Sequence, residues 1–332
     1  MIPKWLRVSI GTASVLGLTE CWLDAKPTTA YTMTYTEGSC TANCAFCPQA
    51  RGSISKKSLL SRVIWPAFPT EKFIHGLMRP AEKIIERVCI QAINYPGFID
   101  DVLALLREIR DATGLPVSLD TPPLGRSNME RLKKAGLDRI SIPLDAATPK
   151  LFDKVKGRSA GGPYSWEEHM KALRTAVEVF GERKVYSNLI VGLGETEEEA
   201  VRLIQQLLDM KIRTALYAFT PVPGTTLVDR PQPPLEAYRR VQLARYLVTQ
   251  GLTRFEDMEF DEGGKLKDPG ADAETIRMAL IEGEAFRTSG CPGCNRPYYN
   301  ERPSGPFYNY PWGLTLEEAQ REAALIGLNE NE

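Results

Sequence analysis

The chain has 332 residues and is 43% apolar, which is enough for a sizeable core in one large domain or two ordinary ones. Its 41 Lys and Arg residues nearly balance its 42 Asp and Glu residues, which argues against a broad nucleic-acid-binding surface but leaves a local patch open. No apolar run reaches the ~18 residues of a membrane span, and no signal peptide is evident. The sequence therefore predicts a cytoplasmic protein that binds neither nucleic acid nor membrane.

Short apolar strands alternate with amphipathic helices through most of the chain. Strands are expected at 31–36, 87–93, 116–120, 139–144, 184–191 and 214–219. Helices are expected at 98–112, 127–134 with Ser127 as N-cap, from Glu195 onward, 235–249, 273–284 and 315–326. Six parallel βα units predict an α/β fold, a partial TIM-like (β/α)6 barrel with its active site at the C-terminal ends of the strands.

The alternation of strands and helices stops near residue 261. A Gly- and Asp-rich loop is expected at 261–273, and a tail rich in Cys, Pro and Tyr at 289–312. The sequence therefore predicts an N-terminal extension (1–28), a barrel (29–260) and an irregular C-terminal tail with a final helix (261–332).

Cysteine usage points to metal chemistry rather than disulfides. An odd number of cysteines without a secretion signal disfavours a disulfide framework. The chain has only two histidines, His75 and His169, so a metal site would rely on thiolates, which favour iron–sulfur clusters or zinc. The seven cysteines are Cys21, Cys40, Cys44, Cys47, Cys89, Cys291 and Cys294.

The most informative segment follows the first expected barrel strand. Cys40, Cys44 and Cys47 have the spacing C-x3-C-x2-C, which allows them to bind three corners of a cubane [4Fe–4S] cluster and leave the fourth iron open. The alternative is a zinc site, which requires a fourth ligand; the nearest histidine in the sequence is His75.

The same segment resembles the signature of the radical S-adenosylmethionine (SAM) superfamily, C-x3-C-x-aromatic-C, with Phe46 at the aromatic position. The resemblance implies that the open iron of a cluster on Cys40, Cys44 and Cys47 chelates the amino and carboxylate groups of SAM. One electron then cleaves a C–S bond and releases a 5′-deoxyadenosyl radical, while the protein orients the cofactor and excludes water.

Four further segments resemble, in chain order, the strand ends of biotin synthase and lipoyl synthase relatives: 89–92, 144–148, 187–196 and 221–227. This resemblance implies that Phe46 and Ile190 lie against the adenine of SAM. It also implies that Ala92 lies near the methionine amine and Asp145 toward the ribose. Together with the cysteine segment, the matches extend over about 230 residues.

The chain departs from biotin synthase at its second cluster. Biotin synthase holds a [2Fe–2S] cluster on three strand cysteines and an arginine, and only Cys89 corresponds to one of them. Ser118 and Tyr186 stand at the other two cysteine positions, and Arg254 is the candidate for the arginine. The resemblance therefore disfavours biotin synthesis by the same cluster.

The C-terminal tail carries a second cysteine motif. Cys291 and Cys294 form a C-x2-C pair that is expected to bind an auxiliary [4Fe–4S] cluster; the alternatives are a zinc site or a loop staple. We expect Cys21 as the best third ligand, with Cys89 or Ser289 competing. Ser289 follows Arg287 and Thr288, which resemble the Arg-Ser-Ser-Tyr motif that supplies a serine ligand in lipoyl synthases.

The pattern resembles most closely a biotin-synthase-related component of a two-protein lipoyl synthase. This implies a sulfurtransferase that inserts sulfur into an octanoyl or mercaptooctanoyl chain on a lipoyl carrier domain or peptide, with the auxiliary cluster as sulfur donor. It also implies a partner radical SAM subunit and an electron donor such as ferredoxin. We favour the second sulfur insertion.

Other functions and roles remain open at this stage. One alternative is a radical SAM methyltransferase or another biotin-synthase-like or carbon-skeleton enzyme whose auxiliary cluster is not consumed. A second is a non-enzymatic iron–sulfur scaffold or sensor, which has no use for an open iron. The tail aromatics are interpreted as packing, or as the wall of an acyl channel: Tyr298, Tyr299, Phe307, Tyr308, Tyr310 and Trp312.

Overall fold

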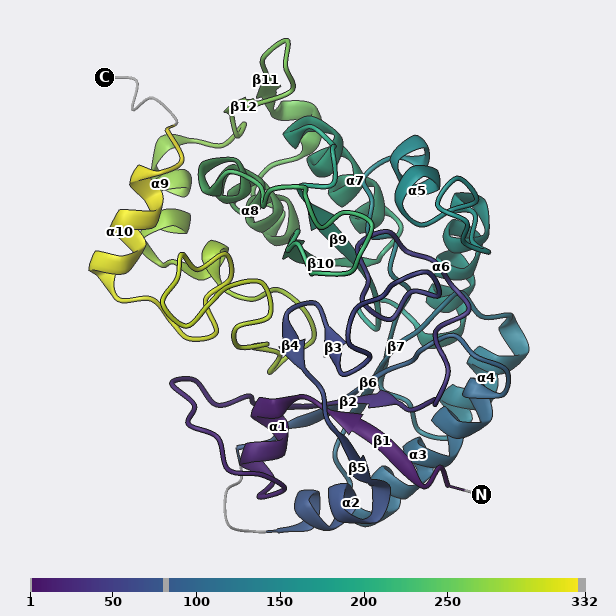
Figure 1. Ribbon diagram of the computed structural model, residues 1–332. Helices are drawn as coiled ribbons and strands as arrows, with labels where there is room; N and C mark the ends of the chain where they lie inside the picture. Colours follow the sequence, from purple (N-terminus) through teal and green to yellow (C-terminus); the bar gives the residue numbers. More distant parts are fainter. Residues whose placement is uncertain (1, 80–83, 328–332) are drawn as a thin grey trace.

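The computed structural model describes residues 2–79 and 84–327, and its centre is one eight-stranded sheet (Figure 1). The strand order is β10-β9-β8-β7-β6-β2-β1-β5. The six strands from β2 to β10 in this order are parallel, and β1 and β5 add an antiparallel edge. The strands are β1 (Trp5–Val8), β2 (Thr29–Thr34), β5 (Ala67–Pro69), β6 (Arg87–Gln91), β7 (Val117–Asp120), β8 (Arg139–Ser141), β9 (Val185–Val191) and β10 (Arg213–Ala218).

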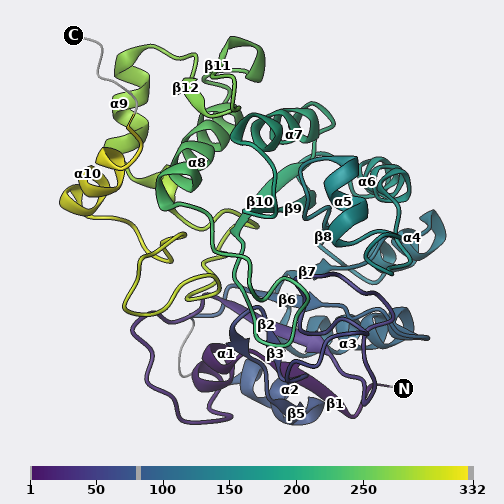
Figure 2. The same ribbon diagram turned by 45° about the horizontal axis from the view of Figure 1, so that its top comes forward.

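Helices follow most of the parallel strands and pack along one side of the sheet (Figure 2). Capping residues define where these helices begin and end. Gly114, with φ 69°, is the C-cap of α3, and Thr196 and Glu199 form a capping box at the start of α7. The helices are α1 (Ile10–Val15), α2 (Thr70–Met78), α3 (Phe98–Thr113), α4 (Arg126–Lys134), α5 (Pro149–Val155), α6 (Trp166–Phe180), α7 (Glu197–Asp209), α8 (Leu235–Gln250), α9 (Ala273–Ile281) and α10 (Leu316–Ala324).

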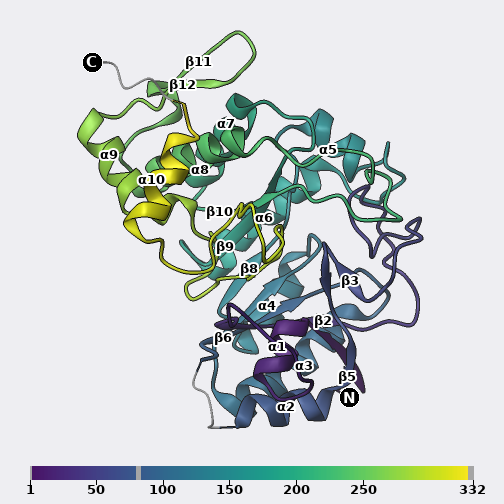
Figure 3. The ribbon, with the colours of Figure 1, turned by 60° about the vertical axis from the view of Figure 1, so that its left-hand side comes forward.

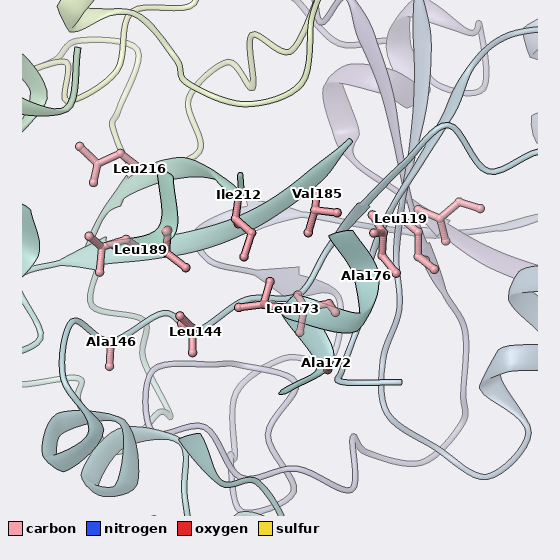
Figure 4. Packing of buried hydrophobic residues seen from close by; sticks show 14 of the residues in the cluster. Leu119, Leu144, Ala146, Ala172, Leu173, Ala176, Val185, Leu189, Ile212 and Leu216 are labelled. Carbon is pink, nitrogen blue, oxygen red and sulfur yellow. The ribbon is translucent and has the colours of Figure 1, made fainter. Parts of the chain in front are cut away.

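The main core lies between this helical layer and the sheet. Leu119, Leu144 and Leu189 come from the sheet side and pack with Leu173 and Ala176 of α6 (Figure 4). All five side chains are fully buried. Because their apolar area is removed from water, this layer holds the strand ends in fixed positions for the loops that follow them.

The C-terminal tail covers the other side of the sheet (Figure 3). At one end it contacts β10, where Leu216 N donates to Ser289 Oγ at 2.8 Å. At the other end it meets the start of β2, where Thr28 N donates to Asn295 Oδ1 at 3.1 Å. The tail therefore bridges the two ends of the parallel array.

The six predicted parallel strands are confirmed within a few residues, and the partial, open barrel is confirmed for the described part of the chain, in which β10 and β5 form the sheet edges. The prediction of Ser127 as N-cap is wrong, because α4 begins at Arg126 after Gly125. The loop expected at 261–273 lies partly in a hairpin, β11 (Glu259–Phe260) with β12 (Leu266–Asp268).

Several elements have no counterpart among the sequence predictions. They are β1, β5, α1, α2, α5, α6 and a small hairpin of β3 (Leu59–Leu60) with β4 (Val63–Ile64). The domain boundaries at 28/29 and 260/261 stay a prediction, although β1 of the N-terminal extension pairs with β2. In the part of the chain that the structure describes, no helix combines the length and apolarity that crossing a bilayer requires.

Candidate active site

Cys40, Cys44 and Cys47 lie on one loop after β2 and line a single cleft at the C-terminal ends of the parallel strands. Backbone hydrogen bonds fold this loop tightly: Cys40 N donates to Gln49 O at 3.1 Å, and Cys47 N donates to Cys44 O at 3.0 Å. The three thiols are thus gathered on a tight turn at the position where parallel βα folds carry their chemistry.

The cysteine loop is supported by the segment after β10. Ile54 N and Ser53 Oγ both donate to Gly224 O, at 3.1 and 2.9 Å. Gly224 has φ +85°, and a Cβ there would lie 2.6 Å from Ser55 N. A side chain cannot fit at this contact, so the glycine of the predicted sixth-strand motif holds the cysteine loop in place.

All four residues expected at SAM line the same cleft: Phe46, Ala92, Asp145 and Ile190. They come from the cysteine loop and from segments at three different strand ends, which the tertiary structure brings together. Their contact with SAM stays a prediction. The cleft encloses about 1140 Å³ of empty space including its open mouth.

Asp145 forms a buried ion pair with Lys156, whose Nζ lies 2.6 Å from Asp145 Oδ2 and 2.5 Å from Pro143 O. Asp145 has φ +66°, a left-handed conformation that aspartate adopts more readily than most residues, and its backbone is fixed by bonds to Asn188 and Ile190. Burial raises the pKa of the Cys44 thiol, and the Lys156 charge opposes that rise. Lys156 therefore favours thiolate at the cysteine loop and orients Asp145 into the cleft.

Asp120, at the end of β7, is a cleft residue that the sequence did not reveal. Its Oδ2 accepts from Asn188 Nδ2 at 3.0 Å, whereas its buried Oδ1 has no partner among the described residues. Burial is the main cause that raises the pKa of Asp120 to about 7. An orphaned carboxyl oxygen in this position fits a ligand that donates hydrogen bonds.

A second group of cysteines lies where the C-terminal tail packs against β2, β6 and β7. Tyr31, Cys89 and Ser118 are direct neighbours on β2, β6 and β7. The Tyr31 hydroxyl lies 3.4 Å from Cys294 Sγ, and Ser118 Oγ donates to Cys291 Sγ at 3.3 Å. Three adjacent strands thus present polar groups to the tail motif.

Cys89 is the third thiol of this group. Burial is the main cause that raises the pKa of Cys89, and the nearby Cys291, Asp120 and Cys294 add to the rise. Burial also raises the pKa of Cys294 to about 12. Such thiols stay protonated at neutral pH unless a metal binds them, because a bound metal ion deprotonates a coordinating thiol. We call Cys89, Cys291 and Cys294 the tail cysteine group.

The other residues expected near this group lie in different surroundings. Cys21 is exposed, and its thiol donates to Trp22 O at 3.5 Å. Ser289 lines a depression with Cys291 and Cys294, but its Oγ accepts from Leu216 N. Arg254 is on the surface in an ion pair with Asp209. The structure therefore brings Cys89 to the tail pair and leaves Cys21 apart.

Arg296 is a buried cation beside the tail cysteine group, and no sequence motif indicated it. Its guanidinium stacks over Tyr217 at 3.8 Å from the ring centroid. Nη2 donates to Ser289 O, while Nε and Nη1 are buried without a partner among the described residues. A buried cation without a carboxylate partner fits a site whose ligand is an anion, such as a thiolate-bound cluster.

The two histidines and the aromatic residues of the tail were the other candidates for a role in the site. His75 is exposed on α2 and does not line the cleft, and His169 packs between Phe152 and Tyr164, so neither supplies the fourth ligand of a zinc site at the cysteine loop. Among residues 2–79 and 84–327, no three His, Cys, Asp or Glu side chains are arranged to hold a single metal ion. Tyr308 and Tyr310 pack in the core, whereas Tyr298 and Tyr299 line clefts.

Comparison with known proteins identifies the chemistry of this cleft. A family model described as "Radical SAM superfamily" matches residues 36–207, which is just over half of the 332 residues. The match begins four residues before Cys40 and extends past β9 into α7. The chain belongs to the radical SAM superfamily.

Within this superfamily the chain resembles biotin synthases at low identity. It is 23% identical over 269 residues to biotin synthase of Sulfurihydrogenibium sp., covering 72% of this chain and 76% of that protein. It is 25% identical over 262 residues to biotin synthase of Akkermansia muciniphila, covering 76% and 75%. The match to biotin synthase of Allorhizobium ampelinum, at 27% identity, covers 65% of each chain.

Solved structures agree on the fold. The FeFe-hydrogenase maturase HydG from Carboxydothermus hydrogenoformans superposes with a TM-score of 0.50 and 14% sequence identity, covering 82% of this chain and 60% of that one. Another HydG structure gives a TM-score of 0.51 at 13% identity, covering 81% and 56%. At such identities the likeness concerns the fold alone.

Membership of the superfamily implies a [4Fe–4S] cluster and SAM in this radical SAM protein, and the cleft fits both. The three thiols on one loop would hold the cluster, and the unpartnered Asp120 Oδ1 would suit the ammonium or hydroxyl groups of SAM. When the cluster and SAM are both bound, they would supply a 5′-deoxyadenosyl radical. The chain's own residues hold the thiolates, orient Asp145 through Lys156 and enclose the cleft.

The raised pKa of Asp120 gives a testable pH dependence. The carboxyl has a pKa of about 7 in the folded protein against 3.8 as its ordinary value, so the folded state binds the extra proton between these values. The free energy of unfolding therefore falls as pH rises from about 4 to 7. Asp120→Asn removes this loss. The free energy of unfolding of the variant minus that of the wild type should be about 2–4 kcal/mol larger at pH 8 than at pH 4.

The measurement is chemical denaturation of the reconstituted, SAM-free protein and of Asp120→Asn at both pH values. Other titrating groups are common to the two proteins and cancel in the difference. A stability difference that does not change with pH would show that Asp120 is ionised normally in the fold.

Proposed function

We propose that this radical SAM protein inserts sulfur into an octanoyl-type chain carried by a lipoyl carrier domain, with a second [4Fe–4S] cluster on the tail cysteine group as the sulfur donor. One observation carries the proposal: a single side chain lines the cleft of the cysteine loop and also contacts the tail cysteine group. Gln91 lines the cleft that contains Cys40, Cys44 and Cys47, here named the SAM cleft, and its Nε2 donates to Cys89 Sγ at 3.1 Å. A substrate carbon between them would be within reach of both a radical and a sulfur source.

In the proposed reaction, the cleavage of one SAM molecule allows the insertion of one sulfur atom. A C–H bond of the chain is exchanged for a C–S bond, and the hydrogen atom leaves in 5′-deoxyadenosine. An external reductant of the ferredoxin class supplies the electron that cleaves SAM. The sulfide that enters the product comes from the second cluster, whose irons take up the electron released when the C–S bond forms. The donor is consumed, so each chain completes about one turnover.

The placement of the cysteines favours lipoyl-type over biotin-type chemistry. Ser118 and Tyr186 stand where the strand cysteines of biotin synthase are expected, and Ser118 instead hydrogen-bonds to Cys291 of the tail. The thiols beside Cys89 thus come from the C-terminal tail and not from neighbouring strands. We propose an acylated carrier domain or peptide as substrate, a second radical SAM subunit as partner, and the second sulfur insertion as the step catalysed here.

The decisive experiment uses clusters rebuilt with heavy-isotope sulfide. The reconstituted enzyme is given SAM, a reductant and either an octanoyl-lysyl or a mercaptooctanoyl-lysyl peptide. We expect heavy sulfur in the product, about one product per chain, and the larger yield from the mercapto peptide. The double variant Cys291→Ala/Cys294→Ala serves as control and should give none.

Two results would contradict the sulfur-donor proposal. One is a product that contains only light sulfur. The other is repeated turnover without added sulfide, which would favour a methyltransferase or carbon-skeleton enzyme whose second cluster survives catalysis.

A further inference from the structure

A second cleft lies between the N-terminal extension and the tail. One wall is formed by α1 and the segment 21–27, and the opposite wall by the segment 296–303 and the β4 region. It encloses about 1110 Å³ of empty space including its mouth. Apolar side chains dominate its lining: Ile10, Leu23, Pro27, Val63, Ile64 and Trp65.

The inner end of this cleft reaches both cysteine groups. Gln91, Tyr217 and Tyr299 line this cleft and also the SAM cleft. Tyr31 also lines its inner part, and the Tyr31 hydroxyl lies 3.4 Å from Cys294 Sγ. The cleft therefore ends between the place where the radical forms and the place where the tail cysteine group lies.

The outer part of the cleft suits a chain that enters from a protein surface. Trp22 is 89% exposed and Ile64 is 52% exposed, which is unusual for large apolar side chains. Farther in, Trp65 is 2% exposed. The lining thus runs from exposed to buried apolar side chains, as expected for a linear aliphatic ligand whose carrier stays outside.

We propose that this cleft, here named the acyl cleft, is the entrance for the carrier-bound acyl chain, and that Gln91, Tyr217 and Tyr299 hold the reacting carbons at its inner end. The inference rests on the proposed function, since it takes the substrate class from it. SAM occupies the other cleft, so a separate entrance lets the chain approach the radical from the side of the tail cysteine group. Arg296 of the tail also lines this cleft.

The location of the chain is tested by photocrosslinking, which needs no turnover. An octanoyl-lysyl peptide with a diazirine near the end of its acyl chain is irradiated with the reconstituted enzyme and SAM, without reductant. We expect crosslinks to residues of the acyl cleft, above all Tyr31, Trp65 and Tyr299. Crosslinks confined to the outer surface, or to SAM-cleft residues that the acyl cleft does not share, would overturn the inference.

A matched pair of variants tests whether the cleft binds substrate. Ala25 lines the acyl cleft on an irregular segment, and Glu20 is exposed on the same segment outside it. Ala25→Trp should raise the octanoyl-peptide concentration that gives the half-maximal single-turnover rate about tenfold or more and reduce crosslinking by a similar factor, because the indole occupies apolar space that the chain needs. Glu20→Trp should change neither.

In Glu20→Trp, formation of 5′-deoxyadenosine without substrate should stay at the wild-type rate, and thermal unfolding of Ala25→Trp shows whether its fold is kept. An unchanged half-maximal peptide concentration and unchanged crosslinking in Ala25→Trp would overturn the inference.

The two proposals fail in distinguishable ways. Crosslinks in the acyl cleft without heavy sulfur in the product would keep the acyl cleft and reject sulfur donation. Heavy sulfur in the product with crosslinks elsewhere would keep sulfur insertion and reject the acyl cleft.

Discussion

Replacing Cys40, Cys44 and Cys47 together with alanine is expected to abolish 5′-deoxyadenosine formation and to remove about four irons per chain. The three thiols line one cleft and lie on one loop, so no other described thiol can take over their position. The loop itself should persist, because its turns are made by backbone bonds such as Cys40 N to Gln49 O. The tail cysteine group should keep its iron.

The measurement combines iron and sulfide content with SAM cleavage under a strong reductant. The matched control is Cys21→Ala, which removes an exposed thiol and should leave both readouts unchanged. If the triple variant still cleaves SAM, the assignment of the cysteine loop is wrong.

The single replacements Cys89→Ala, Cys291→Ala and Cys294→Ala are each expected to lower iron content from about eight to about four per chain and to stop product formation. Cleavage of SAM to 5′-deoxyadenosine should continue, because the cysteine loop is intact. The three thiols are half-buried, and those of Cys291 and Cys294 lie close enough to Cys89 to add to the rise in its pKa that burial causes. Their polar neighbours Tyr31 and Ser118 hold the tail motif against β2 and β7.

This experiment also decides between Cys89 and Cys21 as the third ligand. Cys21→Ala should retain about eight irons, because Cys21 is exposed and its thiol donates to Trp22 O. Loss of the second cluster in Cys21→Ala, with retention in Cys89→Ala, would instead support the ligand expected from the sequence. Thermal unfolding of each variant shows whether a loss of iron reflects a missing ligand or a missing fold.

The sequence by itself determined the features that depend on local spacing. The C-x3-C-x2-C segment fixes three thiols on one tight turn, and the period of apolar residues fixes the six parallel strands. Asp145 follows β8 and Ile190 lies near the end of β9, and parallel strand ends meet at one edge of a sheet, so their common cleft was predictable once the strands were placed.

Only the tertiary structure decided the features that depend on distant contacts. Tyr31 and Cys294 are 263 residues apart in the chain, and no periodicity encodes their contact. The same holds for Cys89 beside the tail motif, for the buried Arg296 and for the acyl cleft. The tail has little regular structure, so its path is set by individual side-chain bonds to β10 and to the start of β2, such as those of Ser289 and Asn295. Such bonds become visible only when the whole chain is folded.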